Sequence, residues 1–380
     1  DAASRLVLRR GDALEVLRDL VIETGARAVN WSRLYDPASI TRDQRVKAAL
    51  KEDGLEACSH AGHVLFEPWT VETGAGSYYK VYTPFWKAVR DIDPGAPVGA
   101  PKLDAAGSWP NSDALGDWTL GAAMNRGGAV LSKYAHVGEE AARGRLGGFM
   151  GHGVERYKED RDRLDRDGTS GLSENLTVGE ISIRTCWAAG QRAMQEGKQG
   201  AETFLKELVW RDFAYHLIWH TPHLAERNWR EEWDGFPWRD ADDATDRWRR
   251  GLTGEPAIDA AMRQMYVSGT MHNRARMLVA SSVTKHLMTD WRVGQDWFAE
   301  CLIDWDPASN AMGWQWAAGS GPDASPFFRI FTPATQADKF DPAHRSREGW
   351  VAELCADAAA ADPDRALAFY DAAPRAWGLD

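Results

Sequence analysis

LIDWDPASNAMGWQWAAGSGPD, residues 302–323, places two tryptophans two positions apart within a run of small residues. Glycine and other small residues let a backbone and a ligand approach closely. A tryptophan offers a flat stacking surface and an N–H group that needs a partner when it is buried. Asp304, Asp306 and Asn310, just ahead of the pair, could hold the hydroxyl and ring N–H groups of a ligand. The stretch indicates a ligand site, although core packing is the simpler interpretation of any single tryptophan.

Tryptophan is the unusual feature of the composition. The chain has 380 residues and is 44% hydrophobic, which is enough for two domains with sizeable cores. It holds 19 tryptophans, and 11 of them lie between Trp210 and Trp316. A cluster this dense favours a bound aromatic cofactor or stacked bases over ordinary packing alone.

The net charge of −11 argues against a nucleic-acid partner for the molecule as a whole. A phosphate backbone responds to a local basic groove, however, so the total charge does not exclude one. Residues 247–250 (RWRR) form one basic and aromatic patch, and Arg274 with Arg276 forms another. A solvated helix face is the simpler interpretation of either patch taken alone.

The N-terminal part alternates strand and helix patterns, which is typical of a parallel α/β sheet. Only two or three repeats are visible, and the chain opens almost directly into a strand pattern. We therefore expect a fragment whose sheet is incomplete without an upstream piece. The predicted elements are strands at 5–10, 27–32, 55–60 and 64–69 and helices at 12–24 and 41–53, the latter capped by Thr41.

A segment rich in Gly, Pro, Ala and Asp follows and indicates a long connection. Beyond it, apolar residues recur at helical spacing, for example in EPAIDAAMRQMYVSG (255–269) and GQDWFAECLID (294–304). The predicted organisation is a partial α/β domain at 1–90, a linker at 91–127 and an all-α domain at 128–380.

Several kinds of site are not supported by the sequence. Neither G-x-G-x-x-G nor G-x-x-x-x-G-K-[ST] occurs. The pairs His216/His220 and His60/His63 lack a third ligand nearby, so no metal site is predicted. The four cysteines lie far apart, which fits a reduced cytoplasmic protein. No apolar run reaches the ~18 residues of a membrane span.

Three further segments point to phosphates and bases. Residues 168–185 begin with a turn rich in Gly, Ser and Thr that leads into a helix, where exposed N–H groups can bind a phosphate. ELVWRDF (207–213) and MHNRARM (271–277) interleave arginine with an aromatic or thioether side chain. Such residues are natural partners of phosphates and bases.

Together these segments resemble the photolyase/cryptochrome family over essentially the whole chain. The matching stretches are YKEDRDRLDRDGTSGLS (157–173), ELVWRDFAYHL (207–217), TGEPAIDAAMRQ (253–264), MHNRARM and the long run 302–342. LYDPASITRDQRVKAAL (34–50) is similar to the plant-cryptochrome side of the family, which includes class III bacterial photolyases. The resemblance implies an α/β antenna domain, incomplete here, and a helical FAD-binding domain.

The resemblance also implies roles for individual residues. Those expected to bind FAD are Tyr157, Thr169, Ser170, Gly171, Leu172, Ser173, Arg211, Arg276, Asp304, Asp306 and Asn310. Those expected to carry an electron from the surface to the flavin are Trp238, Trp291 and Trp314. Those expected to hold the extruded pyrimidine dimer and its DNA strand are Arg161, Glu207, Trp210, Asn273, Arg274, Met277, Trp316 and Gln336. Asn310 and Glu207 are also expected to act in catalysis.

The implied activity is light-dependent repair of cyclobutane pyrimidine dimers by electron transfer from excited reduced FAD, a carbon–carbon lyase reaction. The alternative is a cryptochrome-type blue-light receptor that signals through protein partners. Asn310 and Trp316 favour repair, because plant-type cryptochromes carry Asp at the first position and usually lack Trp at the second. We further expect an antenna pigment, a folate rather than a deazaflavin, and a monomer that binds damaged DNA and no membrane.

Overall fold

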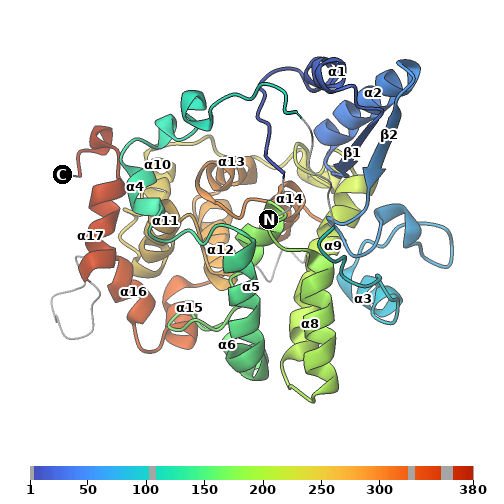
Figure 1. The fold of residues 1–380 in the computed structure, drawn as a ribbon. Coiled ribbons are helices and arrows are strands. Elements are labelled where there is room, and N and C mark those ends of the chain that lie inside the picture. The colour runs from blue at the N-terminus through green and yellow to red at the C-terminus, as the bar shows by residue number, and fades with distance from the viewer. Residues whose placement is uncertain (1–3, 102–107, 324–329, 352–362, 380) are drawn as a thin grey trace.

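The chain folds into a small α/β unit and a larger helical part (Figure 1). The computed structural model describes residues 4–101, 108–323, 330–351 and 363–379. The first elements are α1 (Ala13–Thr24), β1 (Ala28–Ser32), α2 (Pro37–Glu52), β2 (Glu56–His60) and α3 (Tyr82–Val89). The later helices are α4 (Gly127–Leu131), α5 (Glu139–Gly148), α6 (Tyr157–Asp160), α7 (Ser173–Thr177), α8 (Ile183–Gln195), α9 (Ala201–His220), α10 (Asp243–Arg249), α11 (Pro256–Ser268), α12 (Asn273–Ser281), α13 (Trp291–Cys301), α14 (Pro307–Ala318), α15 (Pro333–Phe340), α16 (Arg345–Trp350) and α17 (Pro363–Ala372).

The two strands form a parallel pair, with Ala28 opposite Glu56 and Ser32 opposite His60. Helix α2 makes the crossover between them, and α1 and α2 pack together beside the strands (Figure 1). The small core of this unit is built from Leu14, Val46, Leu50 and Ala57. The predicted fold class, a small parallel α/β unit joined to a helical domain, is confirmed.

Aspartates begin the two N-terminal helices. The Asp12 carboxylate accepts the N–H of Leu14 at 3.0 Å and caps α1. The Asp36 carboxylate accepts the N–H of Ser39 at 2.9 Å and caps α2, whose first residue is a proline. The prediction that Thr41 caps the second helix is therefore wrong. Thr41 lies inside α2, and its hydroxyl donates to the Pro37 carbonyl one turn earlier.

Two of the predicted strands do not form. Residues 5–10 do not form a strand. Their backbone bonds at Leu8 go to Ser112 and Asp113 of the connecting segment, and the Arg9 side chain pairs with Glu23 of α1 at 2.6 Å. In 64–69, the N–H groups of Leu65 and Phe66 both donate to the carboxylate of Asp212, at 2.8 and 2.9 Å. Those N–H groups are thus taken by a side chain and no ladder can form.

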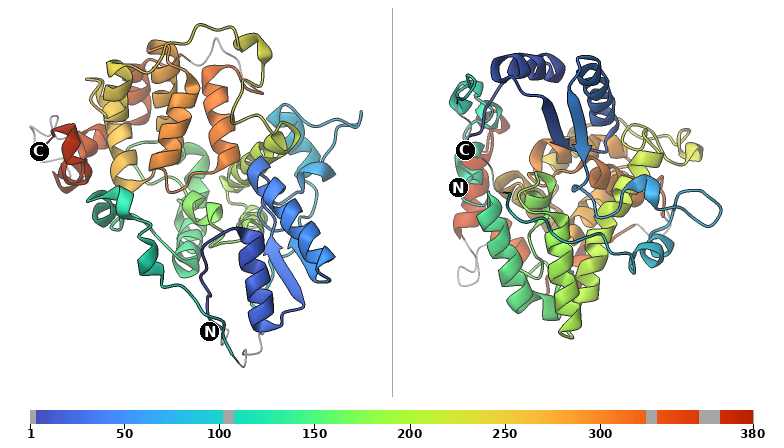
Figure 2. Two further views of the ribbon diagram at one scale, coloured as in Figure 1. Left: turned by 90° about the horizontal axis from the view of Figure 1, so that it is seen from above. Right: turned by 45° about the vertical axis from the view of Figure 1, so that its right-hand side comes forward.

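The connecting segment contains little regular structure. Its described residues, 91–101 and 108–126, hold only two 3₁₀ turns, Leu115–Trp118 and Ala122–Met124. It runs beside the N-terminal residues and then reaches the helical part (Figure 2). This fits the predicted long connection, while the domain boundaries themselves stay predictions.

Helix α9 lies at the centre of the fold, packed against α8 and α14. One apolar core joins its Phe213 and Leu217 to Phe85 and Val89 of α3, so the N-terminal segment packs directly on the helical part. A second core lies between α11, α12, α13 and α14. It includes Trp248, which is fully buried and donates its N–H to the Val279 carbonyl at 3.1 Å. The basic and aromatic patch at 247–250 is therefore an ordinary helix face around a core tryptophan.

Candidate functional site

The beginning of α14 brings four of the predicted cofactor residues together in two ion pairs. Arg276 of α12 donates to both carboxylate oxygens of Asp304, at 2.9 and 2.7 Å. Arg211 of α9 lies 3.9 Å from the Asp306 carboxylate. Both carboxylates are buried, and burial of a charge is tolerated because each has a cationic partner.

Asp306 also fixes the local backbone. Its carboxylate accepts the N–H of Ser309 at 2.7 Å and so caps α14. It accepts the Tyr215 hydroxyl at 2.6 Å as well. Burial raises the pKa of Tyr215, and the negative charge of Asp306 raises it further. The phenol therefore stays protonated and can donate. Asp306 therefore ties α14 to α9.

Arg211 has a second partner that the motif did not indicate. Its guanidinium donates to the carbonyl and the ring Nε2 of His63, the latter at 2.8 Å. Burial and then the charge of Arg211 lower the pKa of His63 to about 4, so the imidazole is neutral and can accept. The His63 ring also meets Tyr215 edge-on at 4.8 Å. A loop from the N-terminal half thus supports this part of the site.

The predicted phosphate turn lies at the start of α7. Gly171 has φ +62°, the left-handed region that favours glycine, and Leu172 beside it is buried. Arg145 of α5 donates to the Gly171 carbonyl and pairs with Glu174. Thr169 and Ser173 remain exposed. The turn therefore offers hydroxyl and N–H groups beside a guanidinium, which suits an anionic ligand.

Tyr157 and Asn310 occupy different surroundings. Tyr157 is buried in α6 and meets Phe149 edge-on at 5.2 Å, with the Arg161 guanidinium 5.7 Å from its ring. Asn310 donates its side-chain N–H to the Gln295 carbonyl of α13 at 3.1 Å. That bond fixes the orientation of the amide.

The three tryptophans expected to carry an electron belong to one apolar cluster. Trp291 and Trp314 are buried, whereas Trp238 is half-buried and lines a surface pocket of about 390 Å³. The Trp291 N–H donates to Asn228 at 2.9 Å. Among the described atoms, the buried N–H groups of Trp238 and Trp314 have no partner. The burial pattern is compatible with a path from the surface inward, and the roles stay predictions.

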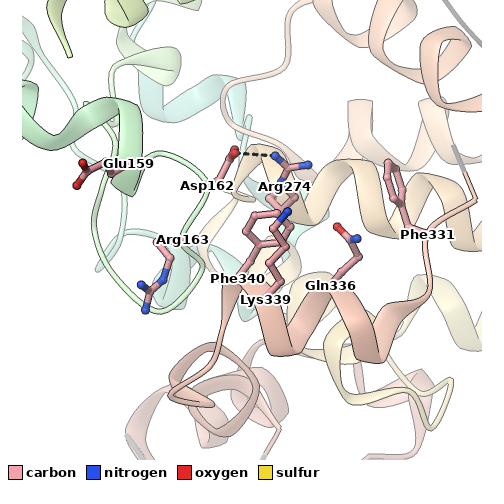
Figure 3. Close-up of a pocket in the computed structure, with 8 residues that line it drawn as sticks. All are labelled: Glu159, Asp162, Arg163, Arg274, Phe331, Gln336, Lys339 and Phe340. Carbon is pink, nitrogen blue, oxygen red and sulfur yellow. Dashed lines mark ion pairs between the residues drawn. The ribbon is translucent and has the colours of Figure 1, made fainter. Parts of the chain in front are cut away.

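A pocket of about 420 Å³ brings together residues predicted to contact DNA (Figure 3). Arg274 lines the pocket, paired with Asp162 at 2.7 Å and with its guanidinium over the Phe340 ring at 4.3 Å. Gln336 of α15 lines the same pocket. The remaining lining residues, which sequence reasoning missed, are Glu159, Asp162, Arg163, Phe331, Lys339 and Phe340.

Two predicted DNA residues lie on α9. Glu207 pairs with Arg161, which lies 4.0 Å from the pocket residue Asp162. Burial raises the pKa of Glu207, and the charge of Arg161 opposes that rise. Trp210, one turn further, is half-buried and lies against Tyr82 with ring centroids 3.6 Å apart. No sequence motif indicates Tyr82, which comes from the N-terminal half and meets Trp210 only in the folded chain.

The other predicted DNA residues lie on α12 and α14. Met277 accepts from Arg274 through its sulfur at 3.8 Å, and Asn273 is exposed at the start of α12. Trp316 is half-buried against the core that contains Trp314. Gln315, between the two tryptophans, is fully buried and bonds the carbonyls of Leu224 and Arg227. The bonds of Gln315 hold α14 in place, with Trp314 and Trp316 on either side of this glutamine in the sequence.

The described residues hold no group of three or more His, Cys, Asp or Glu that could bind a metal ion. In the same described part, no helix is long and apolar enough to cross a bilayer.

Sequence and structure comparisons agree with this geometry. Residues 204–366 match the family described as FAD binding domain of DNA photolyase, and residues 1–102 match the family described as DNA photolyase. The chain belongs to the photolyase/cryptochrome family of FAD-binding proteins. It is 46% identical over 343 residues to a deoxyribodipyrimidine photo-lyase of Agrobacterium fabrum, covering 90% of this chain and 72% of that protein.

Solved structures give the same result. The crystal structure of a bacterial class III photolyase from Agrobacterium tumefaciens matches with a TM-score of 0.88 and 45% identity, over 91% of this chain and 73% of that one. A cryptochrome from Synechocystis sp. matches with a TM-score of 0.81 and 27% identity, over 92% of this chain and 74% of that one. The resemblance seen in the sequence is confirmed.

Proposed function

We propose that this protein repairs cyclobutane pyrimidine dimers in DNA by a light-dependent reaction. The electron that opens the dimer would come from bound reduced FAD and would return to it once the ring has split, so that the overall reaction is redox-neutral. The observation that carries the proposal is the arrangement on α12. Arg276 pairs with Asp304 on the cofactor side, and Arg274, two residues earlier, lines the pocket that Gln336 shares. One helix thus carries both sets of residues, and the similarity to a deoxyribodipyrimidine photo-lyase supports the same activity.

The residues present fit FAD. Arg211 and Arg276 with their two aspartates offer donors and acceptors for a ring system that has both. The turn at 169–173 with Arg145 suits the diphosphate. Buried atoms without a partner in the described structure, the Nε1 of Trp314 and the Oε1 of Gln295, mark places where a polar ligand group could bond. Tyr157 and Asn310 are proposed to complete this cofactor site.

The DNA side is proposed to recognise a pyrimidine dimer that has left the DNA helix. Enzymes that act on bases take them out of the stack and read them by hydrogen bonds and aromatic stacking. Trp210 and Trp316 would supply stacking surfaces, and Glu207, held by Arg161, would accept a hydrogen bond from a base. Arg274, together with Arg161, Asn273, Met277 and Gln336, would bind the strand.

Trp238, Trp291 and Trp314 are proposed to reduce FAD that has become oxidised, a step separate from the repair cycle. Trp238 borders a surface pocket and the other two are buried in the same apolar cluster. Indole rings can be oxidised by one electron, and burial keeps solvent away from the inner two. Asn228, bonded to Trp291 and to Asp234 at 2.8 Å, would hold the middle ring in place.

A cryptochrome-type receptor is the competing function, because a cryptochrome shares the fold. Asn310 and Trp316 support repair over signalling, by the family resemblance described above. The experiment is illumination of the purified, chemically reduced protein with an oligonucleotide that contains one dimer. We expect dimer loss that depends on light. No loss, with FAD bound and the DNA intact, would contradict repair.

We also propose a folate antenna pigment, with a deazaflavin as alternative, and a monomeric state. The spacing of the cysteines supports a cytoplasmic location. Composition and periodicity of the sequence support the domain limits 1–90, 91–127 and 128–380.

A further inference from the structure

Tyr82 covers one face of Trp210. It is the first residue of α3, and its ring lies parallel to the indole, with centroids 3.6 Å apart and an angle of 7° between the planes. Phe213 meets both rings edge-on, each at 5.8 Å. The three aromatics therefore form one rigid group. Among the described contacts, the indole of Trp210 has a stacked neighbour on one of its two faces.

The position of Tyr82 is fixed by more than stacking. Its hydroxyl donates to the Lys206 carbonyl at 2.6 Å, one helical turn before Trp210 in α9. Burial raises the pKa of Tyr82, which keeps the hydroxyl protonated and able to donate. Its backbone N–H reaches the Asp323 carboxylate at 3.4 Å, in the segment that follows α14 and Trp316. Tyr82 thus contacts the chain near both tryptophans proposed to stack on the dimer.

We infer that Tyr82 is a positioning residue for lesion recognition, which acts by holding the Trp210 indole so that its other face is ready to stack on the dimer. The inference rests on the proposed function. A tryptophan that is free to rotate must lose side-chain freedom when it binds, and that loss weakens the complex. Tyr82 removes this freedom before DNA arrives. It also makes α3, from the N-terminal segment, a part of the DNA site.

The competing interpretation is that Tyr82 only fills the core, since just 7% of its surface is exposed. Two comparisons separate the interpretations. Tyr82→Phe keeps the stacked ring and loses only the hydroxyl bond, whereas Tyr82→Leu keeps apolar bulk and loses the stacked face. In a Trp210→Ala background no indole is left to position, so Tyr82→Leu should then have no further effect on lesion binding.

The measurement is the dissociation constant for dimer-containing and undamaged oligonucleotides, at one salt concentration, with the FAD-bound protein. Tyr82→Leu removes an aromatic pair, so we expect this variant to bind the dimer DNA about 2- to 10-fold more weakly than wild type does. Binding of undamaged DNA, held mainly through phosphates, should not change. Tyr82→Phe should be close to wild type. Tyr79→Leu, a half-buried tyrosine that meets Phe85 at 6.0 Å rather than Trp210, is the matched control and should also leave lesion binding unchanged.

The outcomes are distinct. If Tyr82→Leu weakens both DNAs alike, or weakens dimer binding equally with and without Trp210, the residue is structural and the inference is wrong. If Trp210→Ala lowers lesion affinity but Tyr82→Leu does not, the inference fails while the proposed function stands. If wild-type protein does not distinguish the two DNAs, the proposed function fails, and the role of Tyr82 falls with it.

Discussion

Asp304 is the residue whose removal should most directly affect cofactor retention. It is 8% exposed and pairs with Arg276 through two hydrogen bonds. Asp304→Ala would remove a charged acceptor and leave Arg276 without its carboxylate. A charged hydrogen bond is worth about 1.5–3 kcal/mol, so FAD should bind roughly 10- to 150-fold more weakly. The flavin absorbance per protein after gel filtration measures this.

Asp296→Ala is the control for that experiment, because Asp296 is an exposed aspartate of the neighbouring helix α13. It should retain FAD as wild type does. Equal flavin content in Asp304→Ala and wild type would show that the proposed cofactor site is wrong.

Trp238 allows electron supply to be separated from repair. Phenylalanine is much harder to oxidise than tryptophan, so Trp238→Phe should stop the light-driven reduction of oxidised FAD in the presence of an external donor. Repair by protein already reduced chemically should continue, because Trp238 lies at a pocket distinct from the one that Arg274 lines. Trp187→Phe, a buried tryptophan in the other core, is the control and should leave photoreduction intact. A parallel loss of both activities in Trp238→Phe would refute the separate roles.

At the scale of elements, the contact between α13 and α14 depends on a glycine. A Cβ placed on Gly294 would lie 2.1 Å from the ring of Trp314, so the two helices can approach only because residue 294 has no side chain. Gly294→Ala should push Trp314 out of place and destabilise the fold by about 1–3 kcal/mol or more. Urea unfolding measures the change.

Gly144→Ala serves as the comparison, since Gly144 lies in α5 with nothing within 4 Å of its added Cβ. In an open helix position alanine is favoured over glycine by about 1 kcal/mol. We expect that variant to be neutral or more stable. A Gly294→Ala protein as stable as wild type would contradict the close contact.

The helices and strands also show how much of the fold the sequence could predict. β1 formed as predicted and carries the strand formers Val29 and Trp31. β2 also formed, although its sequence EACSH contains no β-branched residue. Helices α1 and α2 formed as predicted, but α2 begins earlier than expected, at the cap Asp36. The pattern at 64–69 failed because its N–H groups bond Asp212, 146 or more residues away in sequence. The pattern of apolar residues indicates which side chains are buried. It does not indicate that a carboxylate far away in the sequence will accept the backbone N–H groups of the segment.

The candidate site divides in a similar way. Motifs indicated the residues of α9, α12 and α14, and the structure brings Arg211, Arg276, Asp304 and Asp306 into one place, although their roles stay predictions. His63 and Tyr82 carry no local signal. They reach α9 only through packing of the N-terminal segment on the helical part, which a single sequence does not encode as a motif.

At the scale of the whole molecule, buried titratable groups set how stability depends on pH. Burial lowers the pKa of His63, His216 and His272 from 6.5 to about 4 in the folded protein. Between these values the unfolded chain takes up protons that the native state does not, so each histidine makes the fold less stable as the pH falls. Each should contribute a loss of about 2 kcal/mol between pH 7 and pH 5.

Asp212 acts in the opposite direction. Burial raises its pKa from 3.8 to about 7, so between these values the native state holds a proton that the unfolded chain releases. Its contribution therefore stabilises the fold as the pH falls, by about 2 kcal/mol between pH 7 and pH 5. The three histidines together outweigh Asp212, and these four groups should contribute a net loss of stability of roughly 3 kcal/mol over this range.

Asp212→Asn tests the balance between these groups. An asparagine oxygen can still accept the N–H groups of Leu65 and Phe66, while the carboxyl that titrates is gone. The variant should be as stable as wild type or more so at pH 7. Its stability should fall more steeply toward pH 5, since Asp212 then no longer offsets the contribution of the histidines. Urea unfolding of both proteins at pH 5, 6 and 7 gives the two slopes. Asp167→Asn, at an exposed position before the phosphate turn, is the control and should keep the wild-type slope. A slope in Asp212→Asn equal to that of wild type would contradict the raised pKa. It would mean that Asp212 is ionised in the native state throughout, and that its burial is compensated by the two N–H groups and by the neighbouring Arg211.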